Sequence, residues 1–156
     1  MKKLIINICI LLISFVTFSC GTLGGFDTRS FLIKKSELNN AFDTLYSKFP
    51  EYNIPNKWKK FDDWKERGYD FLDARIIYFE NNPEEMYYLT FIGDSIAQSN
   101  SQTSIISIRA VCNGSAKWLL VSDFSKDEKE RIEKRLDTAI ISKLESYLNI
   151  KSIRIK

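Results

Sequence analysis

Apolar residues recur at helical spacing in two stretches of this 156-residue chain. In the first stretch they occupy every third or fourth position, at Leu38, Ala41, Phe42, Leu45 and Phe49. The second stretch has its apolar positions at Ile132, Leu136, Ile140, Leu144 and Tyr147 or Leu148. Pro50 should end the first helix, and Ser125 with Glu128 fits the capping box that begins a helix. The pattern therefore predicts an N-terminal helix and a long C-terminal helix.

Four runs rich in β-branched and aromatic residues lie between the two predicted helices. They are residues 74–80, 86–92, 104–112 and 116–123. Turn-forming residues separate the members of each pair, which predicts two β-hairpins. We therefore predict a single α+β domain over residues 31–156. Its mainly antiparallel four-stranded sheet should be flanked by the N-terminal helix and the long C-terminal helix.

The register of each hairpin decides which side chains share a face, because a shift of one residue turns every side chain to the other face. In the first hairpin, pairing Glu80 with Glu85 places Tyr78 opposite Tyr87. In the second hairpin, a three-residue turn is expected, with Ala110 opposite Trp118 and Ile108 opposite Leu120. Both registers gather apolar pairs on one face, which we expect to be buried.

The opposite face of the second hairpin is only partly polar. It carries Ile105, Val111, Leu119 and Val121 among charged side chains. Contiguous exposed apolar surface is unusual on a monomer. Either residues 50–73 cover these four side chains, or the four form an interaction face for a partner.

Residues 50–73 contain an aromatic group, Trp58, Phe61 and Trp64, at short-helix spacing. We expect this segment to close over the core as a flap, and the alternative is a platform for a ligand. The chain ends in an alternating segment, with Ile153 and Ile155 between polar residues. This tail predicts either an edge strand or a contact with anionic lipid.

The first twenty residues have the three parts of a secretory signal. Lys2 and Lys3 give a positive start, an apolar stretch follows, and small residues lead to Cys20. The apolar stretch is shorter than the roughly 20 residues that a membrane-spanning helix needs. The segment is therefore expected to act in export and not in the fold.

The ending Ser19-Cys20 resembles the lipobox of bacterial lipoproteins, although Thr17 stands where that family usually has leucine. The resemblance implies a signal peptide over residues 1–19, cleaved before Cys20. It also implies a diacylglyceryl group on the Cys20 sulfur and a fatty acid such as palmitate on the new amino terminus. Residues 20–30 are then expected to be the lipidated cysteine and a flexible tether.

Two or more acyl chains anchor a protein stably to a bilayer, whereas one does so only marginally. The resemblance therefore implies a protein of the bacterial cell envelope that is attached to the membrane through lipid on Cys20. Residues 21–26 carry no charge. We expect attachment to the outer membrane, facing the periplasm.

Composition excludes several classes of function. The formal charge of +3 falls to +1 once Lys2 and Lys3 leave, so there is no electrostatic reason to expect nucleic acid. The chain has no histidine, which excludes Ser-His-Asp catalysis and histidine-ligated zinc or haem. Cys112 is the single cysteine outside the leader and Cys20, and we expect it to be buried. No motif predicts a metal or another cofactor.

The absence of a catalytic motif favours a non-enzymatic domain that binds a ligand or an envelope protein partner. One alternative is a carboxylate-based hydrolase of an envelope polymer, which needs two acids in one cleft. Its candidate acids are Asp62, Asp63, Asp70, Asp73 and Asp94. The other alternative is a pocket for an apolar ligand, with Tyr78, Tyr87 and Trp118 as its candidate lining.

Overall fold

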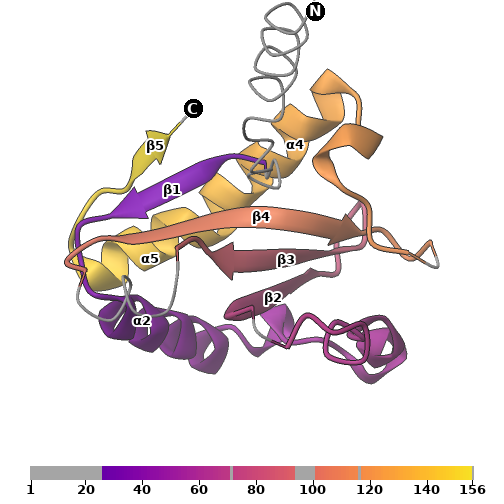
Figure 1. The fold of residues 1–156 in the computed structure, drawn as a ribbon, viewed down its shortest axis with the longest axis horizontal. Helices are drawn as coiled ribbons and strands as arrows, with labels where there is room; N and C mark the ends of the chain where they lie inside the picture. The colour runs from indigo at the N-terminus through magenta and orange to yellow at the C-terminus, as the bar shows by residue number, and fades with distance from the viewer. Residues whose placement is uncertain (1–25, 71, 94–100, 116, 156) are drawn as a thin grey trace, which may run out of the picture.

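The computed structural model describes residues 26–70, 72–93, 101–115 and 117–155. These residues form one antiparallel sheet of five strands in the order β2-β3-β4-β1-β5 (Figure 1). The strands are β1 (Thr28–Phe31), β2 (Ala74–Phe79), β3 (Glu85–Phe91), β4 (Ser104–Cys112) and β5 (Ile153–Ile155). The α+β class and the antiparallel sheet are thus confirmed, with β1 and β5 as strands at one side.

The two predicted helices are present, and both pack on the same face of the sheet. Helix α2 (Lys35–Lys48) ends just before Pro50. The C-terminal helix consists of α4 (Lys126–Leu136), a π-helical turn η5 (Asp137–Ile141) and α5 (Ser142–Leu148). It runs behind the sheet in Figure 1. The predicted capping box is confirmed, since the Glu128 N–H donates to Ser125 Oγ and the Ser125 N–H donates to Glu128 Oε2.

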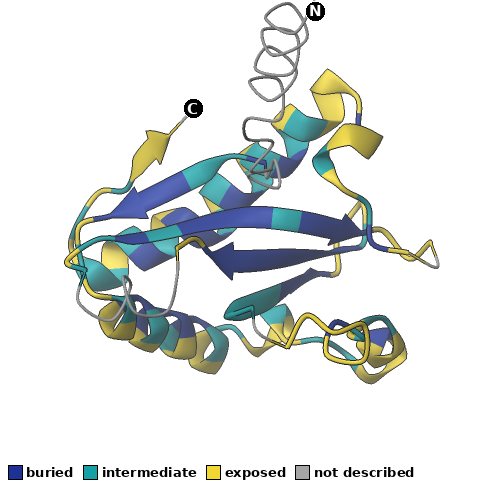
Figure 2. Ribbon diagram, viewed as in Figure 1, coloured by how far each residue is buried: buried dark blue, intermediate teal, exposed yellow. Residues whose placement is uncertain are grey.

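The main hydrophobic core lies between the helices and this face of the sheet. The predicted helical stripes supply it with fully buried side chains, among them Leu38, Phe42, Leu45, Ile132, Ile140 and Leu144. Ile77, Tyr87 and Leu89 face them from the sheet. Figure 2 shows β1, β3 and β4 mostly buried and β5 exposed. Spacing alone therefore identified the helical half of this core.

Residues 50–70, with 72 and 73, cover part of the other face of the sheet as a flap of short 3₁₀ turns, η2 (Pro50–Tyr52) and η3 (Asn56–Phe61), and irregular chain. A second core lies beneath them, made of Trp58, Trp64, Tyr78, Met86, Tyr88, Ala110, Cys112 and Trp118. Two indoles hold the flap down. The Trp58 N–H donates to Glu84 Oε1 at 2.8 Å, and the Trp118 N–H donates to the Phe61 carbonyl at 2.7 Å. The expectation that this segment closes over a core is confirmed.

The predicted register of the first hairpin is wrong by one residue. Tyr78 pairs with Met86 and Ile77 pairs with Tyr87, so Tyr78 and Tyr87 lie on opposite faces. The reason is that both faces of β2 are buried, since Ile77 and Phe79 pack in the main core while Tyr78 packs in the second core. Glu85, opposite Phe79, faces the helices and forms ion pairs with Arg131 and Arg135. An acid at that position is paired across 46 residues of sequence, which local pattern does not reveal.

The second hairpin is also different from the prediction. Residues 117–123 do not form a strand, and within the described part of this hairpin only Val111 and Leu119 pair, as an isolated bridge. A bulge at Arg109 leaves Tyr88 opposite Ala110 and Leu89 opposite Ile108. Ala110 and Ile108 therefore lie on opposite faces, not on one face. After Leu119 the chain turns into the 3₁₀ segment η4 (Val121–Asp123).

Strands β1 and β5 occupy the side of the sheet where the predicted fourth strand is absent. β5 confirms the edge strand predicted for the tail. β1 was not predicted, and it takes residues 28–30 from the expected tether. The leader and Cys20 lie outside the described residues. Within the part of the chain that the structure describes, no helix is long and apolar enough to cross a membrane.

Candidate ligand-binding cavity

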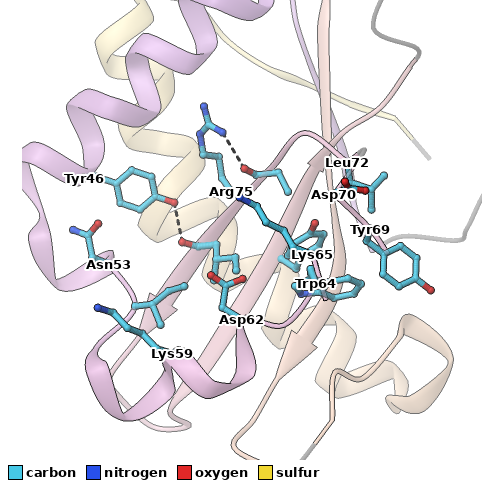
Figure 3. Close-up of a pocket in the computed structure, with 14 residues that line it drawn as sticks. Tyr46, Asn53, Lys59, Asp62, Trp64, Lys65, Tyr69, Asp70, Leu72 and Arg75 are labelled. Atoms are coloured by element: carbon cyan, nitrogen blue, oxygen red, sulfur yellow. Dashed lines mark hydrogen bonds between the residues drawn. The ribbon is translucent and has the colours of Figure 1, made fainter. Parts of the chain in front are cut away.

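A cavity of about 570 Å³ opens between the flap, helix α2 and the β2 side of the sheet. Figure 3 shows Tyr46 and Asn53 on one side of it and Trp64 and Tyr69 on the other. Its lining residues are Tyr46, Asn53, Ile54, Lys59, Asp62, Trp64, Lys65, Tyr69, Asp70, Leu72, Ala74, Arg75, Ile76 and Tyr88. Its volume lies in the roughly 300–1,000 Å³ range of small-molecule sites.

Trp64 is the centre of the aromatic wall. Its ring stacks on Tyr88, with centroids 4.1 Å apart and planes at 19°. Tyr69 meets it edge-on at 5.3 Å, and Trp118 lies 5.3 Å away on a tilted plane. Trp64 is only 8% exposed, so its ring belongs to the packed interior. Aromatic packing of this kind fixes the ring orientation and with it the position of the indole N–H.

The indole nitrogen of Trp64 is buried and has no hydrogen-bond partner among the residues that the structure describes. Leaving a buried donor unpaired costs about 1–3 kcal/mol. The contrast with the other two tryptophans is direct, since Trp58 and Trp118 both donate within the protein. Trp64 therefore lines the cavity and also has a hydrogen-bond donor that no described residue uses.

Two polar side chains of the lining are committed to the fold. The Tyr46 hydroxyl donates to the Ile76 carbonyl at 2.8 Å, and burial raises the pKa of this phenol. Arg75 donates to Asn39 Oδ1 at 2.7 Å and to the Ala74 carbonyl at 2.9 Å. These bonds connect α2 to the β2 side of the sheet. They fix one wall of the cavity.

Four charged side chains of the lining remain available. Lys59, Lys65 and Asp70 form no side-chain hydrogen bond or ion pair within the described part of the chain. Burial raises the pKa of Asp62, with a smaller contribution from nearby Glu66, while Lys65 opposes the shift. The cavity thus has an apolar wall and a rim that carries both signs of charge.

The structure separates the five acids that were candidates for hydrolysis. Asp62 and Asp70 line the cavity. Asp63 accepts a hydrogen bond from Arg67 at 2.7 Å, and Asp73 forms an ion pair with Lys35 at 2.6 Å. Asp94 lies outside the described residues. The sequence could not make this division, because it depends on how the flap folds back over the sheet.

The residues predicted to line an apolar pocket do not line this cavity. Tyr78 and Trp118 are buried in the second core, and Tyr87 is buried in the main core on the opposite face. The register shift in the first hairpin separates the two tyrosines. The sequence did single out Trp64, as part of a flap or a ligand platform, whereas it gave no signal for Tyr46, Tyr69 or Tyr88.

The four residues of the predicted interaction face do not share a surface. Val111 is completely buried in the main core, and Leu119 and Val121 are partly buried against that core. A fully buried side chain offers no contact area to a partner. Ile105 lies on the opposite face of β4, because its neighbour Ile106 belongs to the main core.

No group of three or more acids and cysteines within the described residues could hold a metal ion. Cys112 is a free, buried thiol, and burial raises its pKa. No protein-family model, curated protein or solved structure matches this chain. The cavity and the first twenty residues are therefore the features of this chain that bear on its function.

Proposed function

We propose that this chain is a lipid-anchored protein of the bacterial cell envelope whose domain binds a small amphipathic ligand. Cys20 is the proposed lipid site, on the basis of the leader that ends in Ser19-Cys20. The proposed attachment is to the outer membrane, facing the periplasm. The observation that carries the binding function is the buried, unpartnered indole N–H of Trp64 beside a cavity of about 570 Å³.

The lining defines the chemistry of the ligand. Ile54, Leu72 and Ile76 offer aliphatic surface, which suits an apolar body. An acceptor atom of the ligand would pair with the Trp64 N–H. At the rim, an anionic group of the ligand would pair with Lys59 or Lys65, and a cationic group would pair with Asp62 or Asp70. The proposed ligand therefore has an apolar body, one inward-facing acceptor and a polar end.

The test is a thermal-shift screen of small amphiphiles followed by titration of the hits against two tryptophan variants. Trp64→Phe removes the unpaired N–H and should weaken binding about fivefold, since a hydrogen bond to a neutral acceptor contributes roughly 1 kcal/mol. Trp118→Phe loses the same ring atoms but an N–H that is already bonded to Phe61. We expect Trp118→Phe to keep the affinity and to unfold more easily than Trp64→Phe.

The cavity itself is tested by Ala74→Phe, which places a ring in the site from strand β2. This variant should fold and should lose ligand binding. If hits bind Ala74→Phe and Trp64→Phe as tightly as the wild type, the ligand site is elsewhere and the proposal fails.

A second candidate function is a carboxylate-based hydrolase of an envelope polymer. It is favoured by the position of Asp62 and Asp70 on one cavity and by the raised pKa of Asp62, which suits a general acid. Release of soluble fragments from purified peptidoglycan should then be lost in Asp62→Asn and in Asp70→Asn. Asp63→Asn is the control, because Asp63 is paired with Arg67. Equal release by all variants, or none by the wild type, would exclude this function.

A further inference from the structure

The face of the sheet that the flap covers has a second half, beyond the second core, where β4, β1 and β5 lie side by side. A row of residues crosses it from strand to strand. Ile92 donates its N–H to the Ile105 carbonyl at 2.8 Å. Ile105 pairs with Ser30, and Ser30 pairs with Ile153. Paired residues in neighbouring strands point to the same face, so three isoleucines and one serine form a continuous row.

Counting only the residues that the structure describes, this half of the face is apolar, uncharged and partly open. Ile92 is 44% exposed, Ile153 is 54% exposed and Ile155 is 43% exposed, while Ile105 is half-buried. Beside the row lie Ser107, Thr28 and Ile155, which pair with one another in that order. We call Ile92, Ile105, Ile153 and Ile155 the isoleucine face. Leu32, one residue beyond β1, is 66% exposed.

The charges of β1 and β5 point away from the isoleucine face. Arg29 pairs with Arg154 in register, and both form ion pairs with Asp137 of the π-helical turn, at 2.5 and 2.6 Å. Because these arginines face the helices, their neighbours in each strand face the other way. In this register, the charged side chains of β1 and β5 lie on the side that contacts the C-terminal helix. The aliphatic side chains of β5 lie on the opposite side, which does not contact the helix.

We propose that the isoleucine face docks on the surface of the lipid bilayer that carries the Cys20 anchor. This inference rests on the anchoring proposed above. Phe26 is fixed to the sheet, since its N–H donates to the Ile108 carbonyl at 3.0 Å. Five residues separate it from Cys20, and even a fully extended chain of that length spans only roughly 20 Å. The side of the sheet that contains β1 is thus held within reach of the bilayer.

The composition of the face favours lipid over protein. It consists of aliphatic side chains with short hydroxyl side chains between them, and it has no tryptophan, tyrosine or arginine, the residue types that dominate binding energy at protein interfaces. Aliphatic side chains that enter the boundary between headgroups and acyl chains gain binding free energy from the burial of apolar area. This gain does not require a partner surface of complementary shape. The short strand β5 also offers only three residues for pairing with a second sheet.

The experiment uses the full lipidated chain in vesicles of phosphatidylethanolamine and phosphatidylglycerol. An environment-sensitive fluorophore is attached to Ile153→Cys in a Cys112→Ala background, and the vesicles carry nitroxide-labelled lipid. The control fluorophore is on Lys134→Cys, an exposed position of α4 on the helical side. We expect nitroxide to quench roughly half of the emission at position 153 and little at position 134. Ile92→Asp with Ile155→Asp should abolish the difference while the protein still floats with the vesicles.

The outcomes separate docking from anchoring. If the protein floats with the vesicles and the two fluorophores are quenched equally, docking is wrong and anchoring stands. If mass spectrometry finds no lipid on Cys20 and the protein does not float, anchoring fails and docking loses its basis. Quenching at position 153 that depends on protein density and not on nitroxide lipid would assign the face to a second copy of the chain and overturn the proposal.

Discussion

Replacing Glu85 with alanine should be among the most destabilising single changes in this domain. The Glu85 side chain is only 2% exposed, and its oxygens accept hydrogen bonds from Arg131 at 2.5 and 2.9 Å. Arg135 lies 3.1 Å away, and the buried Tyr87 hydroxyl donates to the same carboxylate at 2.9 Å. One carboxylate thus joins the start of β3 to helix α4.

The size of the effect follows from what each partner loses. Removing one member of a fully buried ion pair costs about 3–5 kcal/mol. Arg131 is partly exposed and can reach water, and Arg135 keeps its bonds to the Pro83 and Asn81 carbonyls. The Tyr87 hydroxyl loses the acceptor that it has among the described residues, which alone costs about 1–3 kcal/mol. We therefore expect Glu85→Ala to lower the free energy of unfolding by about 3 kcal/mol.

Chemical and thermal denaturation followed by circular dichroism measure this loss, which corresponds to a fall in Tm of about 10 °C for a domain of this size. Glu85→Gln keeps the shape and one acceptor and should lose about half as much. Glu80→Gln is the control, because Glu80 is an exposed acid of the same hairpin. A loss below about 1 kcal/mol for Glu85→Ala would refute the reasoning. It would mean that the free energy of desolvating the Glu85 carboxylate cancels the free energy of its ion pairs and hydrogen bonds.

Three further changes test other parts of the structure. Leu45→Ala empties a fully buried site of the main core and should cost about 3–5 kcal/mol in urea denaturation; a loss under about 1 kcal/mol would mean that the core collapses around it. Ser125→Ala removes the N-cap of α4 and should cost about 1 kcal/mol in the same assay, whereas an unchanged midpoint would contradict the cap. Hydrogen bonds from the Ser125 N–H and hydroxyl lower the pKa of Glu128 below its ordinary 4.5. Ionised Glu128 therefore stabilises the fold at pH values above 4.5, and this stabilisation is lost as the pH falls through the lowered pKa of Glu128. Glu128→Gln should lose less stability than the wild type in acid titration, and parallel curves would exclude this linkage.

The parts of the fold that local pattern could predict are those whose side chains interact with near neighbours. Helix α2, helix α4 with its Ser125 cap, and the strands of the first hairpin all follow from spacing or turn residues within a few positions. The flap was predictable because three large aromatic residues in a short, proline-bounded segment need a surface to cover.

The parts that could not be predicted depend on partners far away in sequence. The register of β2 and β3 depends on which face of β2 packs on the helices, and Glu85 at the start of β3 pairs with arginines 46 and 50 residues away. Strand β1 has only four residues and includes Arg29, whose partner Asp137 is 108 residues away. The cavity arises where the flap meets α2 and β2, so no single stretch encodes it. The first twenty residues predict a membrane anchor from a local pattern alone. That prediction therefore concerns the export and attachment of the protein and not its fold.

The pairing of β1 with β5 joins the first and last strands of the described domain. Ser30 pairs with Ile153, so the contact spans almost the whole domain. β1 lies inside the sheet, and its outer edge stays open until β5 arrives. Contacts between distant residues form late because closing a long loop costs entropy before the contact is made. A growing chain would therefore carry an unfinished sheet until residues 153–155 are free, and losing only those residues would leave a folded core with an unpaired strand open to other chains.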